Sequence, residues 1–220
     1  MRQSTGIPGL DHILRGGFLP SRVYLVYGEA GSGKTTFGLH FLAAGRGAGE
    51  RGLLISFGQP EAHVRRDAKA VGLGIDDVPI LDLGPRPETF SEQHTYDIFT
   101  PAEVERDPLS VEISRSIQRI RPQRIFVDSF EDFRQLAPDP FHHRRLVQSF
   151  FRFATDGGAT LVVACTEAES ARDADGLIRL DFSLEGRGLR VIKFRGSGFH
   201  AGHHPVLLTD TGLQVPFSAA

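Results

Sequence analysis

The sequence contains a single cysteine and no long run of apolar residues. With Cys165 alone, no disulfide can form within the chain, which indicates a reducing compartment. No stretch approaches the roughly 18 consecutive apolar residues of a membrane-spanning helix, and the first ten residues lack the apolar segment of a signal peptide. We therefore expect a cytoplasmic protein that does not enter a membrane.

An excess of charge of one sign is also missing. The formal net charge is −2 and the pI is about 6.5, which disfavours a protein that holds nucleic acid through a strong positive field. Hydrophobic residues make up 40% and charged residues 24%, the balance of an ordinary globular protein. A length of 220 residues allows one substantial core, and we predict a single α/β domain over 1–220.

Four nearly continuous apolar runs indicate strands that are covered on both faces, as in a parallel sheet. The runs are Val23–Tyr27, Leu53–Phe57, Ile125–Val127 and Leu161–Ala164. Segments with helical spacing lie between them. These segments are Thr35–Ala44, Glu61–Val71, Ser110–Ile120 and Phe141–Thr155. Alternating strands and helices imply a doubly wound, mainly parallel sheet with helices on both sides.

The pattern changes towards the C-terminal end. Shorter apolar runs at Leu177–Phe182, Leu189–Phe194 and Val206–Leu208 indicate antiparallel strands that extend one edge of the sheet. The stretch Leu83–Pro108 carries several prolines and no clear periodicity. We predict that it is a surface excursion.

Residues 28–35 match the phosphate-binding pattern G-x-x-x-x-G-K-[ST] directly after a predicted strand and at the start of a predicted helix. In such a loop, successive backbone N–H groups and the helix N-terminus face the β-phosphate. Lys34 would reach the β- and γ-phosphates, and the Thr35 hydroxyl would ligate Mg²⁺. The sequence therefore predicts binding of ATP with Mg²⁺. The candidate nucleotide-binding residues are Gly28, Gly31, Ser32, Gly33, Lys34, Thr35 and Thr36.

A second element fits the same chemistry. The apolar run ending at Val127 is followed by Asp128, a carboxylate placed where a strand should end. Such an acid is common by itself, but next to a phosphate loop it is suited to orient Mg²⁺. We predict that Asp128 and Thr35 form the magnesium side of the site.

Further motifs carry a family resemblance. The segment Thr5–Asp11 reads T-G-I-P-G-L-D and is followed by Gly16-Gly17-Phe18 and then by the phosphate loop. Lys193–Ser197 reads K-F-R-G-S, and Thr209–Leu213 reads T-D-T-G-L. In this order the motifs resemble those of KaiC-family ATPases, a branch of the RecA superfamily. The resemblance covers nearly the whole chain and implies a RecA-like P-loop NTPase fold.

The resemblance also implies an assembly. KaiC-like ATPases form rings, usually hexamers, with ATP held between neighbouring subunits. Lys193 and Arg195 would then reach the γ-phosphate held by the adjacent subunit, while Phe194, Thr209 and Asp210 would lie near its nucleoside. Lys193 and Arg195 are two residues apart on a predicted strand and so point to the same side. Without the resemblance, both could equally line the solvated face of an edge strand.

The sequence departs from the family at the residues credited with activating water. The family carries two adjacent glutamates in a segment resembling F-E-E-[ST]-P, whereas this chain reads F-G-Q-P-E from Phe57 to Glu61. Gly58 and Gln59 thus stand at the glutamate positions, and neither supplies a carboxylate base. Gln59 could still orient water, as in small GTPases. Glu61 is expected in the first turn of the next helix, where it favours the helix dipole. We predict slow or impaired hydrolysis.

Autokinase activity like that of the cyanobacterial clock protein, a member of the family that this chain resembles, is disfavoured as well. The acceptor Ser-Thr pair of the clock protein has no counterpart in the comparable segment Ser170–Asp175, which reads S-A-R-D-A-D. The chain also contains one phosphate loop, where the clock protein has two tandem domains.

Three polar clusters in the sequence do not require a functional explanation. The arginines at 115, 119, 121 and 124 and the basic run His142–Arg145 could contact nucleic acid or a protein partner, but we favour solvated helix faces for both clusters. His200, His203 and His204 invite a metal hypothesis, but no cysteine or second histidine cluster completes a ligand set.

The sequence thus favours an ATP·Mg²⁺-binding KaiC-like ATPase or ATP-gated oligomeric switch with an unidentified protein partner. One alternative is a nucleotide-dependent scaffold that hardly turns over, resembling the motor-associated KaiC-like proteins of archaeal surface filaments. Another is a RecA-type recombination mediator, which the near-neutral charge and the lack of an added DNA-binding module disfavour.

Overall fold

A computed structural model describes residues 1–84, 108–131, 133, 139–168, 170–184 and 186–216. The predicted surface excursion lies almost wholly outside these ranges. Within them, the strands are β1 (Val23–Tyr27), β2 (Gly52–Ser56), β3 (Ile80–Asp82), β4 (Arg124–Asp128), β5 (Thr160–Cys165), β6 (Gly176–Ser183), β7 (Gly186–Phe194), β8 (His204–Thr209) and β9 (Gly212–Gln214). The helices are α1 (Pro8–Ile13), α2 (Lys34–Gly47), α3 (Glu61–Ala70), α5 (Pro108–Ile120) and α6 (Pro140–Asp156).

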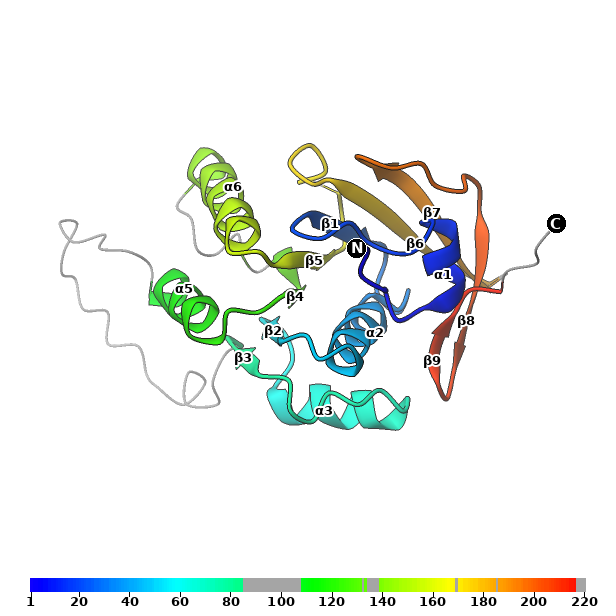
Figure 1. Cartoon of the computed structure of the whole chain (residues 1–220), viewed down its shortest axis with the longest axis horizontal. Helices are drawn as coiled ribbons and strands as arrows, with labels where there is room; N and C mark the ends of the chain where they lie inside the picture. Colours follow the sequence, from blue (N-terminus) through cyan, green and yellow to red (C-terminus); the bar gives the residue numbers. More distant parts are fainter. Residues whose placement is uncertain (85–107, 132, 134–138, 169, 185, 217–220) are drawn as a thin grey trace.

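These strands form one sheet in the order β3-β2-β4-β5-β1-β6-β7-β8-β9 (Figure 1). Strands β3 to β6 in this order are parallel, and β7, β8 and β9 add antiparallel pairs at one edge. This confirms the predicted RecA-like architecture, a mainly parallel sheet with an antiparallel C-terminal edge. Strand β3 was not predicted, because its three residues are too few for a periodic signal.

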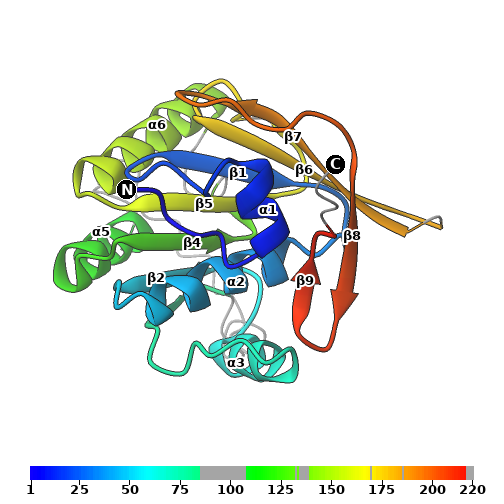
Figure 2. The ribbon, with the colours of Figure 1, turned by 45° about the vertical axis from the view of Figure 1, so that its right-hand side comes forward.

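Helices cover both faces of the sheet. In Figure 2, α1, α2 and α3 lie on one face, and α5 and α6 lie on the other. Alternate residues of β1 show the division, since Tyr24 and Val26 join the core beneath α2, whereas Val23 and Leu25 join the core beneath α6. The runs are continuous because both faces are buried, as predicted. No helix in the described ranges has the length and apolar character that a membrane crossing requires.

The prediction of a basic helix face was wrong for Arg124. Helix α5 ends at Ile120, and Arg124 begins β4 with only 1% of its surface exposed. Its guanidinium donates to the carbonyl oxygens of Ser4 at 2.6 Å and Phe41 at 2.8 Å, and it forms an ion pair with Glu50. A buried charge is tolerated only with such partners. The other three arginines of the cluster, at 115, 119 and 121, are exposed.

Candidate nucleotide site

The phosphate loop connects β1 to α2 at the carboxyl edge of the parallel strands. Gly31 and Gly33 have φ of +79° and +103°, in the left-handed region that glycine adopts without strain. Gly28 has a different reason for lacking a side chain, because an added Cβ would lie 2.1 Å from the carbonyl oxygen of Leu180 on β6. Helix α2 then begins at Lys34, so its N-terminal backbone N–H groups belong to the loop.

Thr35 and Asp128 meet although 93 residues separate them. The Thr35 hydroxyl, on the first turn of α2, donates to Asp128 Oδ2 at 2.8 Å. Asp128 reaches this position because β4 and β1 run parallel with β5 between them. Burial raises the pKa of the Asp128 carboxyl above its usual range, and the hydrogen bond from Thr35 opposes that rise. A hydroxyl beside a buried carboxylate suits a hard cation such as Mg²⁺, whose charge would offset the burial cost.

The Lys34 side chain folds back over the phosphate loop and bonds to its backbone. Its Nζ donates to the carbonyl oxygens of Gly28 at 2.6 Å and Glu29 at 2.9 Å. Ser32 is 1% exposed, and its Oγ has no hydrogen-bond partner among the described residues. A buried hydroxyl without a partner is costly unless a ligand satisfies it. The ammonium and this hydroxyl therefore fit a phosphate group.

The first of the two positions that lack glutamate, Gly58, lies near the end of β4. A Cβ added at Gly58 would lie 3.5 Å from Oγ of Ser129, the residue that follows Asp128, at ordinary van der Waals distance. Ser129 itself has φ of +65°, which is uncommon for a serine. The backbone at Gln59 is fixed by Ser56, whose Oγ accepts from its N–H and donates to its carbonyl oxygen. Position 58 thus has room for a side chain directed at the end of β4.

Glu61 is occupied elsewhere. It lies in the first turn of α3, as predicted, and pairs with Arg65 one turn later at 2.6 Å. Its backbone N–H donates to Asp82, which also accepts from Gly84. Both carboxylates therefore have local structural partners.

Lys193 and Arg195 are not brought to the phosphate loop of their own chain. Lys193 Nζ donates to the carbonyl oxygens of Ala171 at 2.8 Å and Ala174 at 2.6 Å, and burial lowers its pKa. Arg195 has an exposed side chain. In the described part of the chain, no hydrogen bond or ion pair joins either residue to positions 28–35. Their contact with a neighbouring subunit stays a prediction.

The three residues expected near a nucleoside occupy different environments. Phe194 is only 6% exposed, and its ring packs against Tyr24 with a centroid distance of 5.5 Å, so it offers little surface to a base. Thr209 Oγ1 lies 3.0 Å from Thr211 Oγ1 in the turn between β8 and β9, and Asp210 is exposed on that turn. Of the three, Thr209 and Asp210 are accessible to a ligand.

His40 connects the phosphate-loop helix to both terminal motifs. Its Nε2 accepts from Leu213 N–H at 2.8 Å, which leaves the proton on Nδ1, 3.1 Å from the Gly6 carbonyl oxygen. A Cβ at Gly212 would lie 2.2 Å from this imidazole, and one at Gly6 would lie 2.3 Å from the His40 carbonyl oxygen. The glycines of both motifs thus allow two segments to contact α2. Sequence analysis missed His40, since one histidine in an apolar helix carries no signal.

His40 predicts a loss of stability in mild acid. Burial lowers its pKa, so below the ordinary value of about 6.5 the unfolded chain takes up a proton that the folded chain resists. The free energy of unfolding should fall as pH drops from about 6.5 towards the folded pKa, by at most about 1.4 kcal/mol per pH unit. Urea unfolding at pH 7.5 and 5.5 measures this. His40→Gln should be less stable at pH 7.5 and show a flatter profile; parallel profiles would contradict the assignment.

The histidines at 200, 203 and 204 are not arranged as a metal-binding cluster in the described structure. His200 stacks on His12 with ring centroids 5.3 Å apart, and His204 Nε2 lies 3.1 Å from the His200 carbonyl oxygen. Within the described ranges, no group of three or more His, Cys, Asp or Glu side chains is arranged to hold a metal ion.

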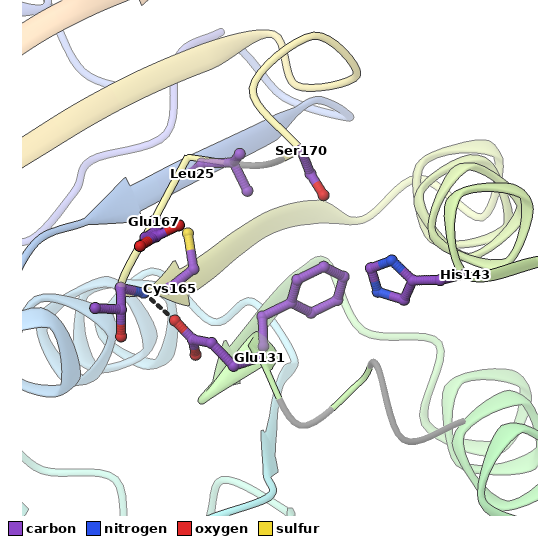
Figure 3. A pocket seen from close by; sticks show the side chains of 8 residues that line it. Leu25, Glu131, His143, Cys165, Glu167 and Ser170 are labelled. Atoms are coloured by element: carbon purple, nitrogen blue, oxygen red, sulfur yellow. Dashed lines mark hydrogen bonds between the residues drawn. The ribbon is translucent and has the colours of Figure 1, made fainter. Parts of the chain in front are cut away.

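A pocket of about 270 Å³ adjoins the site beyond the ends of β1, β4 and β5 (Figure 3). Glu131 and Glu167 come from the segments after β4 and β5, and His143 faces them from α6. The Glu131 carboxylate accepts from the backbone N–H of Thr166, which joins the two segments. Asp128 is three residues before Glu131, so the segment that follows β4 begins at the nucleotide site and also lines this pocket.

Comparison with known proteins agrees with this geometry. The family model described as "ATPase: KaiC" matches residues 3–219. The chain belongs to the KaiC ATPase family. It is accordingly a KaiC-like nucleotide-binding protein, and the resemblance seen in the sequence motifs is confirmed.

Similar proteins fall into two groups by length. A UPF0273 protein of Methanopyrus kandleri is 28% identical, over 97% of this chain and 91% of that protein. A UPF0273 protein of Thermotoga maritima is 27% identical, over 97% and 95%. Circadian clock protein KaiC2 of Synechocystis is 27% identical over 96% of this chain but only 39% of its own length. The chain thus spans nearly all of the first group and about two-fifths of the clock protein.

Proposed function

We propose that this chain is an ATP-gated oligomeric switch that binds ATP with Mg²⁺ and hydrolyses it slowly. The observation that carries the proposal is the 2.8 Å contact between Thr35 and Asp128 beside the phosphate loop. A glycine-rich turn without a nucleotide role would not require a half-buried carboxylate at that hydroxyl. Lys34 would exchange the loop carbonyl oxygens for phosphate oxygens, and Thr35 and Asp128 would hold Mg²⁺, which offsets phosphate charge when bound.

Slow hydrolysis is expected because the residues that would activate the attacking water lack a carboxylate. General-base catalysis contributes about 10²–10⁴ in rate, and position 58 supplies no carboxylate. Gln59 could orient water through its side-chain amide, as a glutamine does in small GTPases, but it cannot take the proton. Its Oε1 is buried and has no hydrogen-bond partner among the described residues. The second candidate is a scaffold that binds ATP and hardly hydrolyses it, and Gly58 and Gln59 favour this function too.

Assembly is the remaining part of the proposal. Arg195 directly follows the last residue of β7 and has an exposed side chain, and Lys193 lies two residues before it, within β7. A head-to-tail contact of this kind repeats around a closed ring of identical subunits, and in such a ring both cations would face the neighbour's ATP. We infer a hexameric ring whose interfaces are completed by nucleotide.

Sedimentation of the purified protein with ATP·Mg²⁺, with ADP and without nucleotide tests this function. We expect ATP to co-sediment with a hexamer and the nucleotide-free chain to be smaller. Arg195→Ala should shift the hexamer to smaller species while ATP still binds, because the phosphate loop is intact. Arg190→Ala, an exposed arginine on the same strand, is the matched control. A monomer at saturating ATP would refute the ring, and absence of bound nucleotide would refute the site.

A further inference from the structure

The β6–β7 hairpin forms one wall of the phosphate loop. It runs beside β1 (Figure 2), and the Leu180 carbonyl oxygen occupies the space that a side chain at Gly28 would need. Further along β6, the Phe182 ring lies 3.5 Å from the Cβ position of Gly31. The hairpin therefore contacts the loop at its first glycine, Gly28, and again at Gly31, which we call the crest of the loop.

Arg187 is held at that crest from the opposite strand. It pairs with Phe182 across the hairpin, and its Cζ lies 4.3 Å from the centre of the Phe182 ring. Nε and Nη2 lie 3.4 and 3.3 Å from the Gly31 carbonyl oxygen. The aromatic face and the strand pairing together fix the guanidinium beside the loop before any ligand arrives.

The charge of Arg187 is not balanced within the described residues. Arg179 and Arg190 of the same hairpin both pair with Asp181, at 2.6 and 3.9 Å. Arg187 forms no ion pair with a described carboxylate, and its polar contacts there are the two long ones to a single carbonyl oxygen. A guanidinium offers five N–H donors in a fork that matches phosphate oxygens. A guanidinium that has no carboxylate partner among the described residues and lies beside an anion-binding loop points to a phosphate ligand.

We propose that Arg187 is a second cationic contact for the nucleotide, made within the same subunit and directed at the end of the phosphate chain. The inference rests on the proposed function. Lys34 and Thr35 would hold phosphate from the start of α2, and Arg187 would add a second cation from the side of Gly31. A contact directed at the γ-phosphate would favour a triphosphate over a diphosphate.

Equilibrium binding of two probes tests this assignment. The probes are the β,γ-imido analogue of ATP, which is not hydrolysed, and ADP, each with Mg²⁺. Arg187→Gln should weaken binding of the ATP analogue about tenfold, the loss of one charge-assisted hydrogen bond, and that of ADP by less than about threefold. Arg190→Gln, which removes the same charge three residues along β7, should leave both affinities within about twofold. The effect should persist at protein concentrations too low for assembly, because the arginine and the loop share one chain.

Each other outcome has a defined meaning. Equal losses for both nucleotides would overturn the proposal, since they would show that Arg187 only shapes the loop. Wild-type affinities for Arg187→Gln would also overturn it. If Lys34→Ala binds like the unchanged protein, the failure lies with the proposed function instead. Should Arg187→Gln not fold, Arg187→Lys keeps the charge without the fork and must still lower the ratio of ATP-analogue to ADP affinity; an unchanged ratio overturns the proposal.

Discussion

Lys34→Ala is expected to weaken ATP·Mg²⁺ binding by at least about 100-fold while the chain stays folded. The ammonium bonds only carbonyl oxygens of the loop itself, Gly28 and Glu29, so the hydrophobic core loses nothing. Two charge-assisted hydrogen bonds to phosphate, at about 1.5–3 kcal/mol each, are lost in the complex. Titration of a fluorescent ATP analogue measures the change, and circular dichroism checks the fold.

The matched control for this prediction is Lys69→Ala. Lys69 lies in the last turn of α3 and is exposed, so its removal changes net charge equally without touching the loop. Its affinity should stay within about twofold of the unchanged protein, as expected of an exposed charge. If folded Lys34→Ala binds as tightly as Lys69→Ala, residues 28–35 are not the nucleotide site.

The double change Gly58→Glu with Gln59→Glu is expected to raise ATP turnover about 10²-fold or more, with little change in ATP affinity. A base at these positions acts only while water attacks, whereas Lys34 and Thr35 act on bound phosphate and Mg²⁺ throughout. A Cβ at position 58 would meet its nearest neighbour at 3.5 Å, an ordinary van der Waals distance, so the first atom of the new side chain is accommodated. Phosphate release under saturating ATP measures turnover.

The control must separate basicity from bulk. Gly58→Gln keeps Gln59 and adds a side chain of the same size as glutamate, and it should leave turnover close to that of the unchanged protein. A different result would redirect the search. If the unchanged protein already hydrolyses ATP rapidly and Gln59→Ala has no effect, another group activates the water, and Glu61→Gln becomes the next variant to measure.

Local motifs made the nucleotide side of the site predictable. The loop and the Thr35–Asp128 pair follow from a glycine-rich turn after an apolar strand and an acid at the end of another, because parallel strands bring their carboxyl ends to one edge. The sequence itself also shows that positions 58 and 59 carry no carboxylate. These features depend on residue type and order, which the sequence states.

Contacts between distant segments that no motif marks were not predictable. The pattern cannot show that Arg124 is buried, since three residues separate the end of α5 from the start of β4 and a charged residue normally signals exposure. It also cannot show that Lys193 bonds Ala171 and Ala174, or that Arg187 lies at Gly31. Such contacts depend on strand register and hairpin twist, which one sequence does not specify.

The wall of the phosphate loop has a consequence for synthesis on the ribosome. Leu180, which packs on Gly28, and Leu213, which bonds His40, are translated long after the loop that they support. Because the N-terminal part of a chain emerges first, the loop leaves the ribosome before either partner exists. A nascent chain that stops before β6 therefore carries the complete phosphate-binding motif without the surroundings that shape it. The surroundings of the phosphate loop are thus complete only after β6 and β9 have been translated.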